Sequence, residues 1–365
     1  MEFIDLKKQY RQYKEKMDKR IEENIESASF ILGKDVRLLE EKLADYVSVK
    51  HAIGCSSGTD ALLIALLAYD LKSGDEILTT PFTFIATAEV ISFVGAKPVF
   101  VDIDENNYNV DPEKIEAKIT ERTKGIIPVS LYGQVPDMDR INKIAQKHRL
   151  FVVEDAAQSF GAVYKGKKSC GLTDIGATSF FPSKPLGGYG DGGMIFTDNE
   201  ILAEKMRSLA NHGQAQRYVH KYVGLNSRLD TIQAGVLLVK FEYFETEAEK
   251  RFKLGRKYSE MFAGSQVITP KIEDYTDRCV YAQYSIRLKN REAVISHLQK
   301  QGIPTAVHYP IPIHLQEAYQ YLGYRAGDYP VSEKTAAEIM SLPMHPFLSS
   351  EEMEQIVKAV KEAIK

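Results

Sequence analysis

Leu150-Phe151-Val152-Val153-Glu154-Asp155 is a short apolar run that ends in two acids. Its length and its β-branched and aromatic residues predict a buried β-strand with a polar carboxyl end. Three similar runs precede it, at 77–80, 97–101 and 125–129. Longer helical patterns lie around and between these runs, at 59–71, 84–94, 112–119 and 137–148. The alternation predicts an α/β fold, with a large domain whose mostly parallel sheet is sandwiched by helices.

The segments outside this alternation predict additional helices and a second domain. Residues 1–50 show apolar positions at helical spacing, and a charged helical stretch from Val239 to Phe262 changes the character of the chain. Beyond it the patterns predict a strand at 281–288, a helix at 291–301 and a last helix opened by the capping box Ser349-Ser350-Glu351-Glu352. We therefore expect a large domain over 1–245, N-terminal helices included, and a smaller α+β domain over 246–365.

The bulk composition excludes several classes of protein. The 365 residues are 44% hydrophobic and include 47 basic and 50 acidic residues, a net charge of −3, so no nucleic-acid or membrane-surface partner is indicated. The three cysteines contain no CxxC motif, which argues against a disulfide framework and a metal site. The longest apolar run, 61–69, is half a membrane span, and the N-terminus has no signal-peptide pattern. These features predict a cytoplasmic protein.

Lys184 lies in the most informative stretch for function, Thr178-Ser179-Phe180-Phe181-Pro182-Ser183-Lys184-Pro185-Leu186-Gly187-Gly188-Tyr189-Gly190-Asp191-Gly192-Gly193. Most lysines are solvated surface groups, which is the ordinary alternative here. The neighbours before Lys184 are apolar or aromatic, and a desolvated lysine loses its proton more easily. The position therefore predicts an amine that forms an imine with a carbonyl cofactor, provided that the chain supplies a pyridoxal phosphate site.

Two other segments predict polar groups at the ends of strands. Ser57, Gly58 and Thr59 precede an apolar helix, where free backbone N–H groups and the helix dipole favour a phosphate; ordinary helix capping explains them equally well. Successive strand residues face opposite sides, so only one of Glu154 and Asp155 can enter a given pocket. Asp155 could hold a pyridinium nitrogen protonated, although a lone acid at this point is more often a helix cap.

Two further segments carry weaker indications. Phe84, soon after a strand, could stack on a planar cofactor, although most aromatic residues of such proteins are core. The turn at 224–230 presents an amide and a guanidinium that suit phosphate or carboxylate binding, or it is an ordinary surface turn. Gly188 to Gly193 formally matches GxGxxG, but a strand pattern at 194–197 follows it. The dinucleotide fingerprint opens a helix, so this match is rejected.

Taken in order, these motifs resemble the DegT-type nucleotide-sugar aminotransferases, which belong to the aspartate-aminotransferase (fold type I) group of pyridoxal-phosphate enzymes. The likeness runs from Phe30-Ile31-Leu32-Gly33 to His308-Tyr309-Pro310. It implies that Lys184 binds the cofactor covalently and that Asp155 is the partner of its pyridinium nitrogen. The remaining cofactor contacts that it implies are Gln158 near the phenolic oxygen, Ser57, Gly58, Thr59 and Ser179 around the phosphate, Phe84 over the ring, and Asn226 reaching the phosphate of the neighbouring subunit.

The resemblance also implies an obligate homodimer with two composite sites, and transfer of an amino group from L-glutamate to a sugar ketone. The loop Pro185–Gly193 looks like that of the C3-transferring branch. It is most similar to enzymes that aminate UDP-2-acetamido-2-deoxy-3-oxo-glucuronate for surface polysaccharides such as O-antigen. Arg228, in trans, would then bind the sugar carboxylate, or form an interface salt bridge, and His308 and Tyr309 would contact the sugar or diphosphate, although His308 could be purely structural.

Three alternatives stay open beside this expectation. The acceptor could be a dTDP-linked 3-keto-6-deoxysugar, within the same chemistry. A dehydratase of the same family would carry histidine in place of Lys184, which argues against that reaction. A non-catalytic pyridoxal-phosphate sensor would usually carry a DNA-binding module, and no basic helix-turn-helix pattern precedes residue 50.

Overall fold

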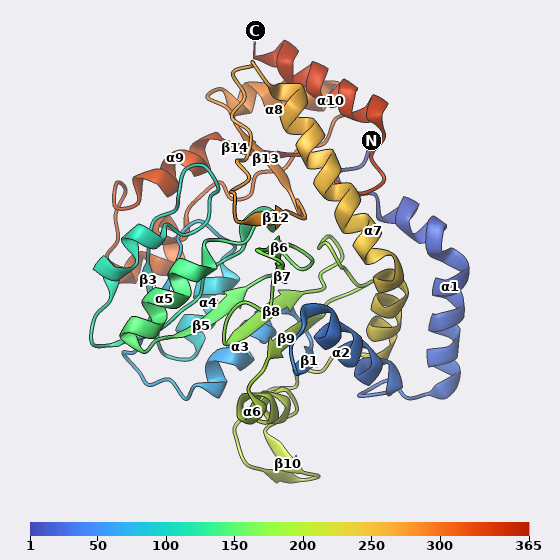
Figure 1. Cartoon of the computed structure of the whole chain (residues 1–365), viewed down its shortest axis with the longest axis vertical. Helices are drawn as coiled ribbons and strands as arrows, with labels where there is room; N and C mark the ends of the chain where they lie inside the picture. The colour runs from blue at the N-terminus through green and yellow to red at the C-terminus, as the bar shows by residue number, and fades with distance from the viewer. Residues whose placement is uncertain (365) are drawn as a thin grey trace.

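The central feature of this computed structural model, which describes residues 1–364, is a seven-stranded sheet with the strand order β1-β9-β8-β5-β4-β2-β3 (Figure 1). Its strands are β1 (His51–Cys55), β2 (Glu76–Thr79), β3 (Lys97–Phe100), β4 (Thr123–Ile126), β5 (Phe151–Asp155), β8 (Ile175–Ser179) and β9 (Gly193–Thr197). Only β9 runs antiparallel to its neighbours. The mostly parallel sheet predicted from the alternating pattern is confirmed, with the carboxyl ends of six strands along one edge.

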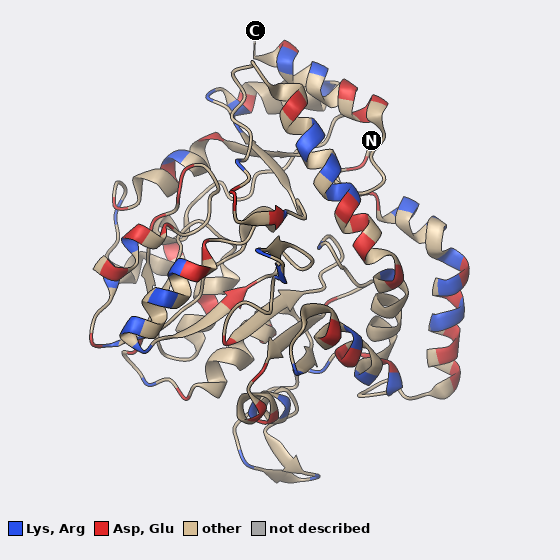
Figure 2. Ribbon diagram, in the orientation of Figure 1, with Lys and Arg blue, Asp and Glu red and all other residues tan. Residues whose placement is uncertain are grey.

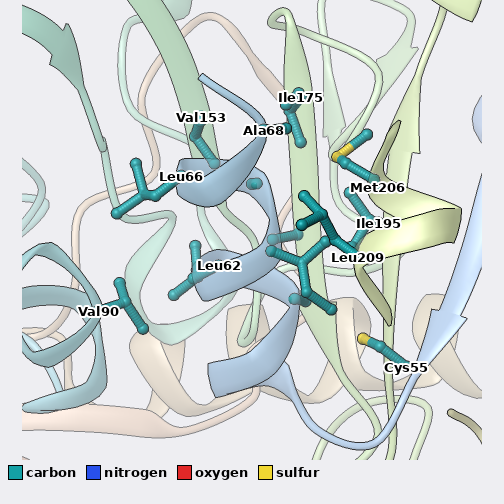
Figure 3. Packing of buried hydrophobic residues seen from close by; sticks show 14 of the residues in the cluster. Cys55, Leu62, Leu66, Ala68, Val90, Val153, Ile175, Ile195, Met206 and Leu209 are labelled. Carbon is teal, nitrogen blue, oxygen red and sulfur yellow. The ribbon is translucent and has the colours of Figure 1, made fainter. Parts of the chain in front are cut away.

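Helices cover both faces of this sheet, as the continuous apolar strands require. The helices of the large unit are α1 (Leu6–Ser27), α2 (Lys34–Val47), α3 (Gly58–Ala68), α4 (Ala86–Phe93), α5 (Met138–His148), α6 (Glu200–Ala210) and α7 (Thr231–Phe262). In β9, Ile195 packs with Leu62 of α3 and Leu209 of α6 (Figure 3). The next residue, Phe196, points to the other face and packs with Leu39 of α2 and Leu237 of α7.

Two element predictions need correction. Residues 112–119 do not form the expected α-helix but two 3-10 turns, η1 (Pro112–Lys114) and η2 (Glu116–Lys118). The segment offers only Ile115 as a buried apolar side chain, which is too little packing to support two α-helical turns. The helix expected from Val239 begins at Thr231 instead, because its first part is buried and apolar and lacks the charges that mark the rest.

The C-terminal part of the chain folds around a second core. Its elements are β12 (Thr276–Arg278), β13 (Tyr284–Arg287), α8 (Arg291–Lys300), η4 (Ile313–Leu315), η5 (Glu317–Leu322), α9 (Pro330–Glu338), β14 (Ile339–Leu342) and α10 (Ser350–Ala363). Strands β13 and β14 pair in antiparallel fashion, and α8 and α10 pack on them. The capping box at Ser349 and Glu352 is confirmed. Because α7 passes unbroken through residue 246, where the small domain was expected to begin, the division into domains stays a prediction.

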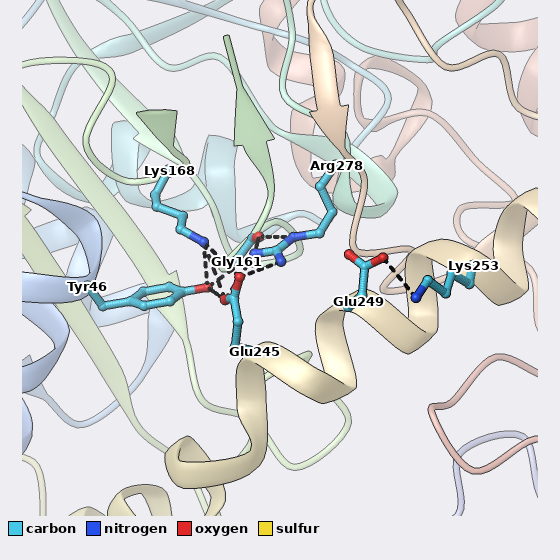
Figure 4. Close-up of polar contacts among 7 residues, drawn as sticks. All are labelled: Tyr46, Gly161, Lys168, Glu245, Glu249, Lys253 and Arg278. Atoms are coloured by element: carbon cyan, nitrogen blue, oxygen red, sulfur yellow. Dashed lines mark hydrogen bonds and ion pairs between the residues drawn. The ribbon is translucent and has the colours of Figure 1, made fainter. Parts of the chain in front are cut away.

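The two parts are tied together along α7. Strand β12 joins β6 (Val163–Tyr164) and β7 (Lys167–Lys168) in a three-stranded sheet. Beside it, Glu245 of α7 accepts from the Arg278 guanidinium at 2.6 and 3.1 Å, from the Tyr46 hydroxyl at 2.6 Å and from Lys168 (Figure 4). These four side chains come from four separate segments, so the cluster fixes the C-terminal part against the sheet. The remaining hairpin, β10 (Gln214–Gln216) and β11 (Val219–His220), projects beyond α6 (Figure 1).

In the view of Figure 2, charged residues of both signs are spread along the exposed helices, α1 and α7 above all. Within residues 1–364, no helix is long and apolar enough to cross a membrane.

Candidate active site

The predicted site residues gather where the parallel strands end, because several motifs follow the carboxyl ends of neighbouring strands. Asp155 is the last residue of β5, and Ser179 is the last residue of β8. In the sheet register Ser179 lies opposite Gly193, which in turn lies opposite Cys55, the last residue of β1. The start of α3 at Gly58 therefore lies at the same edge as the two strand ends.

Asp155 lies at the centre of this edge and is nearly inaccessible, with 6% of its surface exposed. Its Oδ2 accepts from the Thr87 hydroxyl at 2.7 Å, and its Oδ1 accepts from the backbone N–H of Ala157 at 3.2 Å. Burial raises the pKa of Asp155, while the hydroxyl of Thr87, the N–H of Ala157 and the charge of Lys184 oppose that rise. The pKa of this carboxylate is therefore set by burial on one side and by its two hydrogen bonds and the nearby cation on the other.

Glu154 points to the opposite side of the strand, as alternation requires. Its carboxylate is buried and accepts from Ser130 at 2.7 Å, Ser169 at 2.6 Å and the N–H of Cys170 at 2.8 Å. Three protein donors bind this fully buried carboxylate, so Glu154 is structural and Asp155 is the acid at the site.

Lys184 follows β8 by five residues, in a turn closed by its backbone N–H donating to the Phe181 carbonyl at 2.8 Å. Burial lowers the pKa of its amine, and the negative charge of Asp155 acts in the opposite direction. The same charge of Lys184, together with burial, lowers the pKa of His308 to about 4. The charge of Lys184 thus acts on both Asp155 and His308, which places the three groups in one neighbourhood.

The start of α3 forms a tight cradle against Ser179. A Cβ atom at Gly58 would lie 2.6 Å from the Cβ of Ser179, and a Cβ at Gly193 would lie 2.3 Å from the Ser57 carbonyl oxygen. The side chain of Ser57 caps α3 by accepting from the N–H of Asp60 at 3.0 Å, as ordinary capping predicts. The N–H groups of Gly58 and Thr59 open the helix and keep the anion-binding position that the phosphate interpretation needs.

A second group of side chains is linked to this edge through Gln158, which follows Asp155 by three residues. Gln158 is buried; its Oε1 accepts from the N–H of Tyr132 at 2.7 Å, and its Nε2 donates to the Tyr309 hydroxyl at 3.1 Å. The Phe84 ring is 54% exposed and lies 6.0 Å from the ring of Tyr309, so one face of it is free to cover a planar group. His308 is held by its Nδ1 at 3.1 Å from the Ser341 hydroxyl.

Asn226 and Arg228 are the predicted residues that the structure does not bring into this group. Asn226 is exposed, and Arg228 donates to the Asn211 side chain at 3.2 Å. Arg228 lines a separate cavity of about 680 Å³ beside α2 and α6, and its Nε is buried without a partner among the described residues. Ser227, between them, contacts Ser56 beside the cradle at 3.1 Å, so the turn touches the back of the site without entering it.

Sequence reasoning missed two residues that shape the site. Thr87, which donates to Asp155, was visible only as part of the Thr80–Thr87 stretch, and no spacing in that stretch indicates its partner. Tyr132, whose hydroxyl donates to the His308 carbonyl and whose N–H binds Gln158, has no local sequence signature.

The residues present fit pyridoxal phosphate. At Gly58 the backbone lies too close to Ser179 for any side chain, which leaves the N–H groups at the start of α3 accessible to a phosphate. Asp155 offers a buried carboxylate, and Lys184 offers an amine with a lowered pKa. The fold and this edge define a pyridoxal-phosphate enzyme of the α/β type, with one lysine and one buried acid at the same edge of the sheet.

Comparison with known proteins agrees. Residues 11–361 match the model of the DegT/DnrJ/EryC1/StrS aminotransferase family, and the chain belongs to that family. It is 51% identical over 360 residues, 99% of each chain, to a UDP-2-acetamido-2-deoxy-3-oxo-D-glucuronate aminotransferase of Pseudomonas aeruginosa. It is 47% identical, over 98% of this chain and 97% of the relative, to a pleiotropic regulatory protein of Geobacillus stearothermophilus.

A solved structure of ntda from Bacillus subtilis with bound cofactor PMP has a TM-score of 0.91 and 30% identity, and the match covers 99% of this chain and 83% of that one. The resemblance and the α/β fold class expected from the sequence are confirmed. The protein is an aminotransferase, and its cofactor is pyridoxal phosphate.

Proposed function

We propose that this aminotransferase moves an amino group from L-glutamate to the C3 ketone of UDP-2-acetamido-2-deoxy-3-oxo-glucuronate, a step in making surface polysaccharide such as O-antigen. One observation carries the proposal: the relative named for that substrate is 51% identical over 99% of both chains. The loop from Pro185 to Gly193, which indicated the C3 branch, lies directly against the site through the contact of Gly193 with Ser57.

Each residue at the strand edge has a proposed task. Lys184 would bind the cofactor and, when released, would carry a proton between the substrate carbon that bears the amino group and the cofactor, which its lowered pKa favours. Asp155 would hold a proton on the pyridine nitrogen. When bound, the cofactor supplies an electron sink for the bond-breaking step. The proposed cofactor contacts beside these two are Ser57, Gly58, Thr59, Ser179, Phe84, Gln158 and, from the other subunit, Asn226.

The substrate contacts proposed are Arg228, His308 and Tyr309. The pKa of His308, lowered to about 4 by burial and the charge of Lys184, keeps the ring neutral at working pH, so it would act as a hydrogen-bonding group and not as a cation. The pKa of Tyr309 is raised, first by burial and then by the charge of Asp155, so its hydroxyl stays protonated. Both groups can therefore donate to oxygens of a negatively charged sugar nucleotide.

A homodimer with composite sites is the proposed working form. Arg228 has a buried Nε without a partner within residues 1–364, and Asn226 is exposed beside it. The surface around this turn carries unusually exposed apolar side chains for a monomer, Val223 at 96%, Ile201 at 77% and Tyr218 at 77%. A second copy covering this face would bury them. We also propose a cytoplasmic location, consistent with the three unpaired buried cysteines.

A sensor function is the second candidate, because one relative is named a pleiotropic regulatory protein. The charges of Lys184 and Asp155 act on one another, and the lowered pKa of the Lys184 amine supports turnover instead, since binding alone does not require it. A mobility-shift assay with genomic DNA separates the two, because a DNA-binding sensor would retard DNA and the proposed transaminase would not.

The decisive experiment starts from the purified enzyme in its amine-loaded form. It is mixed with the UDP-linked 3-keto uronate or with a dTDP-linked 3-keto-6-deoxysugar, and the amino sugar formed is followed by mass spectrometry. We expect rapid amination of the uronate and, for Lys184→Ala, none. Preference for the dTDP sugar would refute the proposed acceptor, and turnover by Lys184→Ala would refute the proposed role of the lysine.

A further inference from the structure

Helix α7 carries three polar side chains at a spacing of seven residues: Gln233, Lys240 and Glu247. Two turns of an α-helix take about 7.2 residues, so the three project from nearly the same face. Lys240 is 3% exposed and Glu247 is 5% exposed, and charged groups are rarely buried without a specific partner. None of the three belongs to the strand-edge site, so their partners need a separate explanation.

Two of these side chains hold the backbone that follows Lys184. The Lys240 ammonium donates to the Gly187 carbonyl at 2.7 Å and lies 4.3 Å from the ring centroid of Tyr189. Gln233 accepts through its Oε1 from the N–H of Tyr189 at 2.8 Å. The helix thus holds a carbonyl three residues after Lys184 and an N–H five residues after it.

The segment itself has little freedom left between these two points. The N–H of Gly188 donates to the Phe180 carbonyl at 2.7 Å, and a Cβ at Gly187 would lie 2.4 Å from the Pro182 carbonyl oxygen. A backbone this close to its own preceding turn can shift only as a unit. A hydrogen bond that holds the Gly187 carbonyl therefore also restrains the turn that contains Lys184.

The third side chain, Glu247, links α7 to helix α1. Glu247 accepts from Gln9 at 3.0 Å and from the Tyr13 hydroxyl, both in α1. Burial lowers the pKa of Lys240 to about 8, and the charge of Glu247 opposes that shift. One helical turn further on, Arg251 donates to the carbonyls of Tyr281 and Met344 at 3.2 Å in the C-terminal part. This part of α7 is therefore held by α1 through Glu247 and by the C-terminal part through Arg251.

We propose that Lys240, assisted by Gln233, is a positioning residue that holds the turn of Lys184 and so keeps its amine at the strand-edge site. This inference rests on the proposed function only in taking Lys184 as the reacting amine. Lys240 would touch neither cofactor nor substrate, and would act through the Gly187 carbonyl.

The test compares Lys240→Met, which keeps the aliphatic stem and removes the donor, with Lys240→Arg, which restores one. The matched control is Lys168→Met, which removes a second, partly buried lysine that binds Tyr46 and Glu245 away from the site. Hydrogen–deuterium exchange of the cofactor-loaded enzyme reports on the amides of 184–190. A hydrogen bond from a charged donor is worth enough that its loss speeds such exchange about tenfold or more.

We expect Lys240→Met to speed exchange at 184–190, lower kcat about tenfold to a hundredfold with little change in KM for the sugar, and alter the absorbance of the lysine-bound cofactor. Lys240→Arg should recover most of each change, and Lys168→Met should lower thermal stability alone. Wild-type exchange and kcat in Lys240→Met, or equal effects in Lys168→Met, would overturn the proposal.

A second variant covers the case in which Lys240→Met does not fold. Gln233→Met changes a partly buried side chain of similar size and removes the acceptor for Tyr189. It should speed exchange at 184–190 as well, and unchanged exchange would count against the proposal. Because exchange does not depend on the identity of the sugar, a wrong acceptor in the proposed function leaves this result intact.

Discussion

Replacing Thr87 with valine tests how the protein sets the charge of Asp155. The Thr87 hydroxyl donates to Oδ2 at 2.7 Å inside a buried site, and valine has the same shape without the donor. A hydrogen bond to a charged group contributes ~1.5–3 kcal/mol, and one pKa unit corresponds to ~1.4 kcal/mol. Losing the bond should therefore raise the pKa of Asp155 by about one to two units.

The pKa rises and does not fall because the Thr87 hydrogen bond stabilises the ionised carboxylate of Asp155. Burial already raises the pKa of Asp155 and the Thr87 bond opposes that rise, so Thr87→Val allows protonation at higher pH. The carboxylate must be ionised to hold a proton on the ring nitrogen, so the acid limb of the pH profile of kcat should move up by the same one to two units.

The assay measures kcat at pH values from about 5 to about 9, so that the acid limb of the profile is sampled. Thr83→Val is the matched control, because the Thr83 hydroxyl lies 3.3 Å from that of Thr87 and makes no hydrogen bond to Asp155. Its acid limb should stay within a few tenths of a unit of wild type, roughly the scale of indirect effects. Coincident acid limbs for Thr87→Val and wild type would refute the reasoning.

Two further predictions concern the cradle and the C-terminal part. Gly58→Ala places a Cβ 2.6 Å from that of Ser179, an overlap that the cofactor-free protein already has to relieve, so its thermal stability should fall and cofactor affinity in an absorbance titration should fall at least about tenfold; unchanged stability and affinity would contradict the close contact of Gly58 with Ser179. His345 is buried, and burial lowers its pKa to about 4 in the folded protein. Because the unfolded chain binds this proton already near pH 6.5, the free energy of unfolding should fall as the pH drops from about 6.5 toward about 4, by up to ~1.4 kcal/mol per pH unit. Urea unfolding of His345→Gln should show a shallower slope, and equal slopes would contradict the assignment.

Local patterns were sufficient for residues whose role depends on their place in one element. Asp155 was predicted from the end of an apolar run, Gly58 from small residues ahead of an apolar helix, and Lys184 from the apolar turn around it. Each depends on strand ends and helix starts, which hydrophobic periodicity reveals. The sheet edge then brings such residues together without any further information from the sequence.

Residues that act over long separations were not predictable in this way. Lys240 lies 53 positions from the carbonyl it binds, and Thr87 lies 68 positions from Asp155. Nothing in their own neighbourhoods indicates a partner, because such pairs form only when the whole sheet and α7 are in place. The two 3-10 turns at 112–118 were mispredicted for the opposite reason: the helical spacing was present, but the packing that would support an α-helix was not.

The reversed direction of β9 has a consequence for redesign. Since β8 ends at Ser179 beside the residue where β9 begins, Gly193, the intervening segment leaves and rejoins the sheet at one place. Lengthening or shortening that segment would leave the strand spacing unchanged, but it would displace the turn of Lys184 that Lys240 and Gln233 hold. Changes of length there would therefore act on the reacting amine and not on the scaffold.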